Sequence, residues 1–176
     1  MLKFQRKKYC QLFIFLSLIL SSYKPPADPN AKIKVIFIYN FTKYIEWPSA
    51  YKKGDFVIGV LGNTSLLPDL ETLARTKTIG GQKCVIKTYL AIKDIQQCHI
   101  LFIPIEKSDQ LEPVLKKIKG MSTLVVTEKA GLARKGSVIN FINVENKQKF
   151  ELNKTNANKN GLVVSSNLMS LGIAID

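Results

Sequence analysis

Phe56-Val57-Ile58-Gly59-Val60-Leu61-Gly62 is an unbroken apolar run closed by a glycine, and it decides the fold class. A run of this length without polar alternation is typical of a strand buried on both faces, as in parallel sheets. The next residues, Asn63-Thr64-Ser65, have side chains suited to capping a helix. We therefore predict a strand over residues 56–62 that leads into a helix over residues 66–76.

The chain downstream repeats this alternation of strands and helices. Three more runs have the length and composition of strands: residues 84–89, 98–103 and 122–127. Apolar residues at helical spacing predict a helix over residues 108–119, and residues 92–97 are expected to form a short helix or turn. Alternating strands and helices predict a mostly parallel sheet with helices on both faces.

The last third of the chain adds a hairpin to this sheet. Residues 138–144 and 149–153 flank the polar stretch Asn146-Lys147-Gln148, a pattern typical of two antiparallel strands. Three short elements are expected after the hairpin: a helix over residues 155–160, a strand over 162–165 and a closing helix over 167–173. The predicted fold is a three-layer α/β sandwich, a mostly parallel sheet with an antiparallel edge hairpin.

An amphipathic helix is predicted upstream of the first strand. From Ala31 onward the chain has apolar residues at helical spacing, namely Ile33, Ile36, Phe37, Phe41, Tyr44 and Ile45. The helix is expected to stop at Pro48, because the residue before a proline is pushed out of the helical region. The single tryptophan, Trp47, is thereby placed at the end of the helix.

The first residues of the chain resemble an export signal. Residues 1–22 combine four cationic side chains, no acid, the apolar run of residues 12–20 and two closing serines, a pattern typical of a secretory signal peptide. At about 1.5 Å per residue that run is too short for a membrane-spanning helix. A lipid anchor is disfavoured because Cys10 precedes the apolar run. We predict an extended leader over residues 23–30 and a single domain over residues 31–176.

The charge of the chain is strongly basic, but it does not favour nucleic-acid binding. Removing the four cations of the signal from the formal net charge of +13 leaves +9. Base and phosphate recognition favours arginine, and only Arg75 and Arg134 remain after processing. Lysines are scattered through every segment instead of forming one stripe. We interpret them as a solvated surface, with no nucleic-acid partner.

Two cysteines remain in the exported part, Cys84 and Cys98, each at the start of a predicted strand. An exported domain can form disulfides. In the usual open α/β sheet the first strand lies between the second and the third, which would separate the two cysteines by roughly 9 to 10 Å. That separation exceeds the reach of a disulfide, so we favour two unpaired, buried thiols and leave pairing as the alternative.

Residues for catalysis or metal binding are sparse. His99 is the only histidine, and its neighbour Cys98 points to the opposite face of a strand, so the pair cannot chelate one ion. A zinc site needs three or four protein ligands, and we interpret His99 as structural. The turn over residues 59–65 lacks both the P-loop and the dinucleotide glycine pattern. We predict no catalytic residues, no metal and no cofactor.

Two aromatic residues near the end of the first helix are the candidate contact residues. Phe41 and Ile45 are expected to pack in the core. Tyr44 and Trp47 each combine an aromatic body with a polar tip, a kind of side chain enriched in binding hot spots. We predict that these two contact a partner or a small ligand.

An ordered set of segments resembles one known family. The aromatic helix ending in Tyr44-Ile45-Glu46-Trp47-Pro48, the strand Ile58–Gly62 and the strand Cys98–Ile103 are similar to those of YfiR/HmsC-like periplasmic proteins. The loop and hairpin between residues 131 and 153, and residues 161–166, are similar too. The resemblance runs in the same order from about residue 31 to residue 171.

The resemblance implies a regulatory function. Members of the family are exported to the periplasm, often dimeric, and restrain an inner-membrane diguanylate cyclase or accompany a sensor kinase. The expected role is therefore non-catalytic control of cyclic-di-GMP, biofilm or kinase output by a homodimer. A periplasmic small-ligand-binding module, for sensing or delivery, is the alternative. A hydrolase or oxidoreductase would require His99 to line an open cleft beside a nucleophile.

Overall fold

The computed structural model describes residues 27–176. The predicted signal peptide over residues 1–22 lies outside the described residues, as do residues 23–26 of the predicted leader. Among residues 27–176, no helix combines the length and the apolar character needed to cross a membrane.

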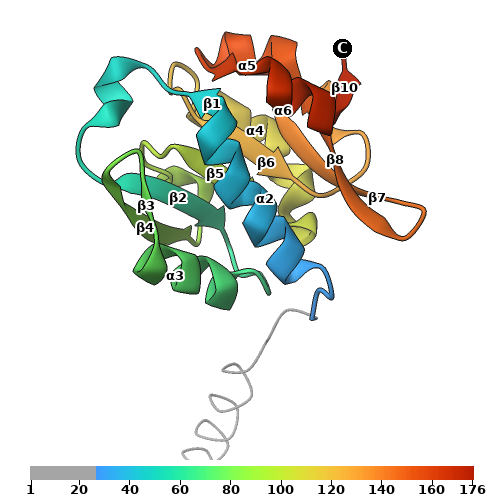
Figure 1. The fold of residues 1–176 in the computed structure, drawn as a ribbon, viewed down its shortest axis with the longest axis horizontal. Coiled ribbons are helices and arrows are strands. Elements are labelled where there is room, and N and C mark those ends of the chain that lie inside the picture. Colours follow the sequence, from blue (N-terminus) through green and yellow to red (C-terminus); the bar gives the residue numbers. More distant parts are fainter. Residues whose placement is uncertain (1–26) are drawn as a thin grey trace, which may run out of the picture.

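An eight-stranded mixed sheet is the centre of the fold, with strand order β10-β8-β7-β6-β5-β2-β4-β3 (Figure 1). The strands are β2 (Phe56–Leu61), β3 (Thr78–Ile79), β4 (Gln82–Tyr89), β5 (Ile100–Ile103), β6 (Leu124–Thr127), β7 (Ile139–Val144), β8 (Lys147–Asn153) and β10 (Ile173–Ile175). Strand β2 pairs in parallel with both β4 and β5. The predicted order, with the first long strand between the next two, is confirmed.

Helices cover both faces of this sheet, as the sequence predicts. They are α2 (Ala31–Tyr44), α3 (Leu67–Thr76), α4 (Leu111–Lys117), α5 (Lys154–Lys159) and α6 (Ser166–Leu171). In Figure 1, α2 crosses the near face of the sheet between α3 and α6, while α4 lies behind the sheet. The three-layer α/β architecture is therefore confirmed.

Two apolar clusters fill the spaces between the layers, and strand β5 shows how one sequence run supplies both. Ile100 and Phe102 point to the cluster under α2, whereas Leu101 and Ile103 point to the cluster under α4. All four side chains are fully buried. Strand neighbours face opposite sides, so a continuous apolar run is required wherever helices cover both faces of a sheet.

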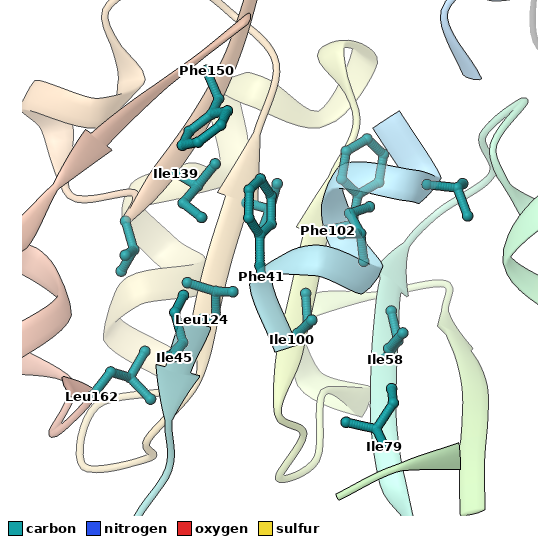
Figure 2. Close-up of a cluster of buried hydrophobic side chains, with 14 of the residues drawn as sticks. Phe41, Ile45, Ile58, Ile79, Ile100, Phe102, Leu124, Ile139, Phe150 and Leu162 are labelled. Carbon is teal, nitrogen blue, oxygen red and sulfur yellow. The ribbon is translucent and has the colours of Figure 1, made fainter. Parts of the chain in front are cut away.

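The helix α2 is anchored in the first cluster by Phe41. Its ring stands edge-on to Phe150, with centroids 5.0 Å apart, and lies 6.0 Å from the ring of Phe141. Figure 2 shows the Phe41 ring pointing from α2 toward the side of the sheet where Ile139 and Phe150 lie. A fully buried phenylalanine contributes about 3–5 kcal/mol when compared with alanine, so Phe41 accounts for a large part of the docking of α2.

The end of α2 differs from the sequence prediction. The helix stops at Tyr44, three residues before Trp47, and Ile45 is already extended with φ −117°. The reason is a tertiary pairing: strand β1 (Ile45–Glu46) pairs antiparallel with β9 (Val163–Val164). Hydrogen bonds to a segment more than 110 residues away override the local helical pattern, which sequence periodicity does not reveal.

The buried face of α2 also differs from the expected one. Ala31, Val35, Ile38 and Phe41 are buried, whereas Ile33 is 44% exposed and Ile36 is 59% exposed. Both isoleucines belong to the periodic pattern from which the helix is predicted, but they lie on its outer side. The helix has apolar residues on both its buried and its outer side. Helical spacing alone therefore does not show which apolar residues face the core.

The hairpin of β7 and β8 is present with a tighter turn than predicted. Glu145 and Asn146 form the turn, with φ values of 52° and 59°, and β8 begins at Lys147. Two successive residues with positive φ are typical of a two-residue type I′ hairpin. The sequence analysis missed two short strands at the sheet edges, β3 and β10.

Candidate functional site

Trp47 lies just after β1, at the edge of the sheet where the parallel strands begin. Its indole is 7% exposed and its Nε1–H donates to the carbonyl oxygen of His99 at 3.1 Å. The ring also stands edge-on to Phe56, the first residue of β2, with centroids 5.2 Å apart. The side chain is therefore held by one hydrogen bond and by edge-on contacts with the rings of Phe56 and His99.

His99 occupies the centre of this aromatic group, directly before β5. Its Nδ1 accepts the backbone N–H of Val57 at 3.1 Å, and its Nε2 lies 2.8 Å from the carbonyl oxygen of Tyr51. These two partners require a neutral ring with the proton on Nε2. Burial lowers the pKa of His99, and the bond to the Tyr51 carbonyl opposes the shift without cancelling it.

The contacts around the His99 ring rule out a reactive role for this side chain. Its ring stacks on Phe56 with centroids 4.1 Å apart and meets Tyr51 edge-on at 5.3 Å. Both nitrogens are occupied by backbone groups, so neither is free to take a proton from a substrate or to ligate an ion. The structural interpretation of His99 from the sequence therefore agrees with its contacts.

A pocket opens beside this aromatic group. The 3-10 helix η1 (Ser49–Lys52) forms one wall, and the Gln82 side-chain amide fixes it by donating to the carbonyl oxygens of Tyr51 and Gly54 at 3.0 and 3.1 Å. The pocket has a volume of about 310 Å³. Its lining is partly aromatic: Thr42, Ile45, Glu46, Trp47, Tyr51, Lys52, Phe56, Ile79, Gly80, Gln82 and His99.

The two predicted contact residues are separated by the structure. Trp47 lines the pocket, whereas Tyr44 does not belong to its walls. Tyr44 is half-buried at the end of α2, packs against the core cluster, and its carbonyl oxygen accepts the N–H of Ser165 at 2.9 Å. That either residue contacts a partner or a ligand stays a prediction.

A second polar site, which the sequence analysis missed, lies at the opposite edge of the sheet. Lys34 of α2 reaches the carboxylates of Asp28 at 2.7 Å and Glu128 at 2.5 Å. Glu128 follows β6 directly, and its other oxygen accepts the N–H of Ile105 at 2.9 Å. A pocket of about 230 Å³ borders these residues together with Thr64.

This second site occupies the place where open α/β sheets usually bind ligands. The chain turns from β2 toward β4 on one side and toward β5 on the other, and the crevice at the carboxyl ends of β2 and β5 is the switch point. Thr64 after β2 and Glu128 after β6 are polar residues that follow apolar strands, the only sequence signal that pointed here.

The charge of Lys34 is neutralised by the two carboxylates of this second site. Burial lowers the pKa of Lys34, but the hydrogen bonds and charges of Asp28 and Glu128 outweigh burial and raise it above its usual value. Lys34 is therefore a protonated tether that holds the start of the described chain to β6. It is not a free amine available as a nucleophile.

The two cysteine thiols are also buried away from any substrate. Burial raises the pKa of the Cys84 thiol to about 11 and that of Cys98 to about 12. Both cysteines are free, buried and protonated at neutral pH, and β2 lies between them. Within residues 27–176, no three histidine, cysteine, aspartate or glutamate side chains gather as they would around a metal ion.

Comparisons with known proteins agree with this architecture. Eight chains among solved structures match, including the crystal structure of a conserved domain protein from Vibrio cholerae O1 biovar El Tor. That structure superposes with a TM-score of 0.56 at 14% identity, over 83% of this chain. At this identity the likeness shows the fold alone. This chain spans 60% of the length of that one.

The family comparison is more specific. No curated protein matches this chain. A model of the family described as YfiR/HmsC-like, a family of periplasmic regulators, matches residues 31–173. The match begins at the first residue of α2 and includes every helix and nearly every strand of the described fold. The chain belongs to the YfiR/HmsC-like family.

Proposed function

We propose that this protein is exported and binds the periplasmic domain of an inner-membrane signalling enzyme, either a diguanylate cyclase or a sensor kinase, and restrains it. The observation that carries the proposal is the family match over residues 31–173, the whole of the described domain apart from its ends. The protein acts without catalysing a reaction. In support, His99 is bonded at both nitrogens and both thiols are buried.

The mechanism is state-selective binding. A regulator shifts a two-state enzyme only by the difference between its affinities for the two states. To shift the enzyme population from 99% active to 1% active, the regulator must bind the inactive form roughly 10⁴-fold more tightly than the active form. Such a preference comes from a protein surface that fits one arrangement of the target, and it needs no chemistry in the regulator.

The active form of the regulator is proposed to be a homodimer. The edge strand β10 supports this, because its residues Ile173, Ala174 and Ile175 carry no charge and no strand of residues 27–176 lies on its outer side. Uncharged sheet edges favour pairing with another chain. Analytical ultracentrifugation of the processed protein tests it: a dimer is expected, and a monomer at all concentrations contradicts it.

The proposal is tested by recovering the target. The processed, tagged protein is used to capture solubilised membrane proteins from the cells that produce it, followed by mass spectrometry and by measurement of cyclic-di-GMP and kinase output after deletion. A cyclase or sensor kinase is expected in the eluate, with raised output in the deletion strain. Unchanged cyclic-di-GMP, biofilm matrix and kinase output would contradict the proposal.

A small-ligand-binding module is the second candidate, and the pocket of about 310 Å³ beside Trp47 favours it. Pockets of this size that combine aromatic walls with polar side chains suit small metabolites. Trp47 is the only tryptophan, so its emission reports on this pocket alone. A saturable change in emission with one compound supports binding, and constant emission across a broad metabolite panel counts against it.

A further inference from the structure

The helix α2 has two apolar faces, and only one of them is covered. Val35, Ile38 and Phe41 are buried against the sheet, while Ile33 and Ile36 on the other side are 44% and 59% exposed. A helix that is apolar all round is normally buried on all sides. The composition of α2 is therefore that of a helix with a second neighbour, which residues 27–176 do not supply.

Exposed apolar residues continue beyond α2 on the same layer. Helix α6 lies beside α2 (Figure 1), and its last residue, Leu171, is 65% exposed. Strand β9 pairs with β1, the direct continuation of α2, and its Val163 is 62% exposed. We call these four residues the outer apolar face: Ile33, Ile36, Val163 and Leu171. Ile33 and Ile36 are neighbours one turn apart on α2, and exposed apolar residues of this kind mark interaction sites.

The charges around the outer apolar face are all positive on α2. The helix contains no acidic residue, and its exposed Lys32 and Lys43 lie near its two ends. Lys34, by contrast, is turned to Asp28 and Glu128 and is neutralised there. The exposed Glu46, opposite Val163, is the acid at the far end of the surface, after α2 has ended. Around the isoleucines of α2, a partner that supplies carboxylates around an apolar centre complements the surface.

The charge pattern argues against a second copy of this chain at the same place. Two α2 helices packed antiparallel across a two-fold axis would bring Lys43 of one copy toward Lys32 of the other. Like charges facing each other across an interface are unfavourable, and α2 offers no acid to compensate.

A membrane surface is also a poorer match. Helices that lie in a bilayer interface insert tryptophan, phenylalanine and leucine from one face. Here Trp47 is buried, Phe37 and Tyr44 are half-buried, and the exposed apolar residues of α2 are isoleucines. Aromatic side chains held by the fold are not available for insertion.

We propose that the outer apolar face docks a partner protein whose contact surface has an apolar centre ringed by aspartate or glutamate side chains. The inference rests on the proposed function, because it takes that partner to be the periplasmic domain of the restrained enzyme. Half-buried Tyr44 and Phe37 border the same face and add contact area. Ile36 lies at its centre on α2.

Site-specific photocrosslinking of the full chain in its own cells tests the proposal. One photoreactive residue replaces Ile36, and in a matched control it replaces Leu90, which is 82% exposed and follows β4. A crosslinked cyclase or kinase is expected from position 36 and not from position 90. Ile36→Asp is expected to weaken capture of the same enzyme by about tenfold or more, because it removes an apolar contact and adds a repelled charge.

Charge variants separate the apolar and the electrostatic contributions to binding of the enzyme. Lys43→Glu is expected to lower capture of the enzyme, Ile36→Lys to lower it less than Ile36→Asp, and Leu90→Asp to leave it unchanged. Melting of each purified variant confirms that the fold persists, since the altered side chains are exposed.

The outcomes that overturn the inference are distinct from failure of the proposed function. If the enzyme is captured but crosslinks only from position 90, or is unaffected by Ile36→Asp, the outer apolar face is not the docking site while the function stands. A crosslinked product of two copies of this chain, or lipid adducts from position 36, also overturns it. Recovery of no signalling enzyme from any position removes the proposed function itself.

Discussion

The His99 cluster predicts a specific loss of stability at mildly acidic pH. Burial lowers the pKa of His99 in the folded protein below its usual value of 6.5. The physical reason is that a proton on Nδ1 would face the N–H of Val57, which now donates to that atom at 3.1 Å. Protonation therefore breaks one hydrogen bond and places a charge among Trp47, Tyr51 and Phe56.

The direction and the size of this loss of stability follow from proton linkage. Above pH 6.5 the ring is neutral in the folded and the unfolded chain, so it contributes no pH dependence. Below pH 6.5 the unfolded chain binds a proton that the folded chain resists, so the free energy of unfolding falls with pH. Between pH 7.5 and 5.5 the loss is at most about 1.4 kcal/mol, because one pH unit corresponds to 1.36 kcal/mol for one proton.

Urea unfolding of the processed protein at pH 7.5, 6.5 and 5.5 measures this loss. The control is His99→Asn, whose amide oxygen can accept from Val57 but does not titrate. The wild-type protein is expected to lose stability toward pH 5.5, and the variant to lose much less. Carboxylates have reference pKa values near 4 and contribute little in this range. Equal slopes for the two proteins, or a flat wild-type curve, refute a neutral His99.

Two further predictions concern the other buried polar groups. Lys34→Met leaves the carboxylates of Asp28 and Glu128 facing each other without a cation, and thermal unfolding is expected to show a loss on the order of 2 kcal/mol, between the values for surface and buried pairs. In the native protein Cys84 and Cys98 are expected to react with Ellman's reagent at pH 8 far more slowly than in urea, since burial keeps both protonated. Rapid native labelling would contradict that placement.

The architecture was predictable because its strongest signals are local. The run Phe56–Leu61 and the run Ile100–Ile103 need no knowledge of the rest of the chain to be identified as two-sided strands. Parallel strands with helical connections then restrict the strand order. The position of Cys84 and Cys98 on either side of β2 follows from that order alone.

The sites were harder to predict because they are made by contacts between distant residues. Trp47 bonds to His99, and the end of α2 is set by strand β9, neither of which leaves a mark in local periodicity. Lys34 and Glu128 are 94 residues apart. Lys34 is one of three lysines in α2, and the sequence did not indicate that this one would meet a carboxylate.

The placement of α2 connects the two pockets with the surface proposed to bind a partner. The helix begins at the carboxyl edge of the sheet, where Lys34 contacts Glu128, and its continuation reaches the opposite edge at Trp47. Its 14 residues span about 21 Å at 1.5 Å per residue. Ile33 and Ile36 lie on the outside of the same element.

A regulator and a ligand-binding module are therefore compatible functions for this fold. A compound bound beside Trp47 contacts Thr42 of α2 and Ile45 directly after it, and thereby the helix that carries the outer apolar face. It would change the affinity for a partner only to the extent that it binds the free and the partner-bound protein differently, and the partner would change the compound's affinity by the same factor. Titrating Trp47 emission with and without the captured enzyme measures that factor: a shift in the dissociation constant shows coupling, and identical curves show that pocket and surface act independently.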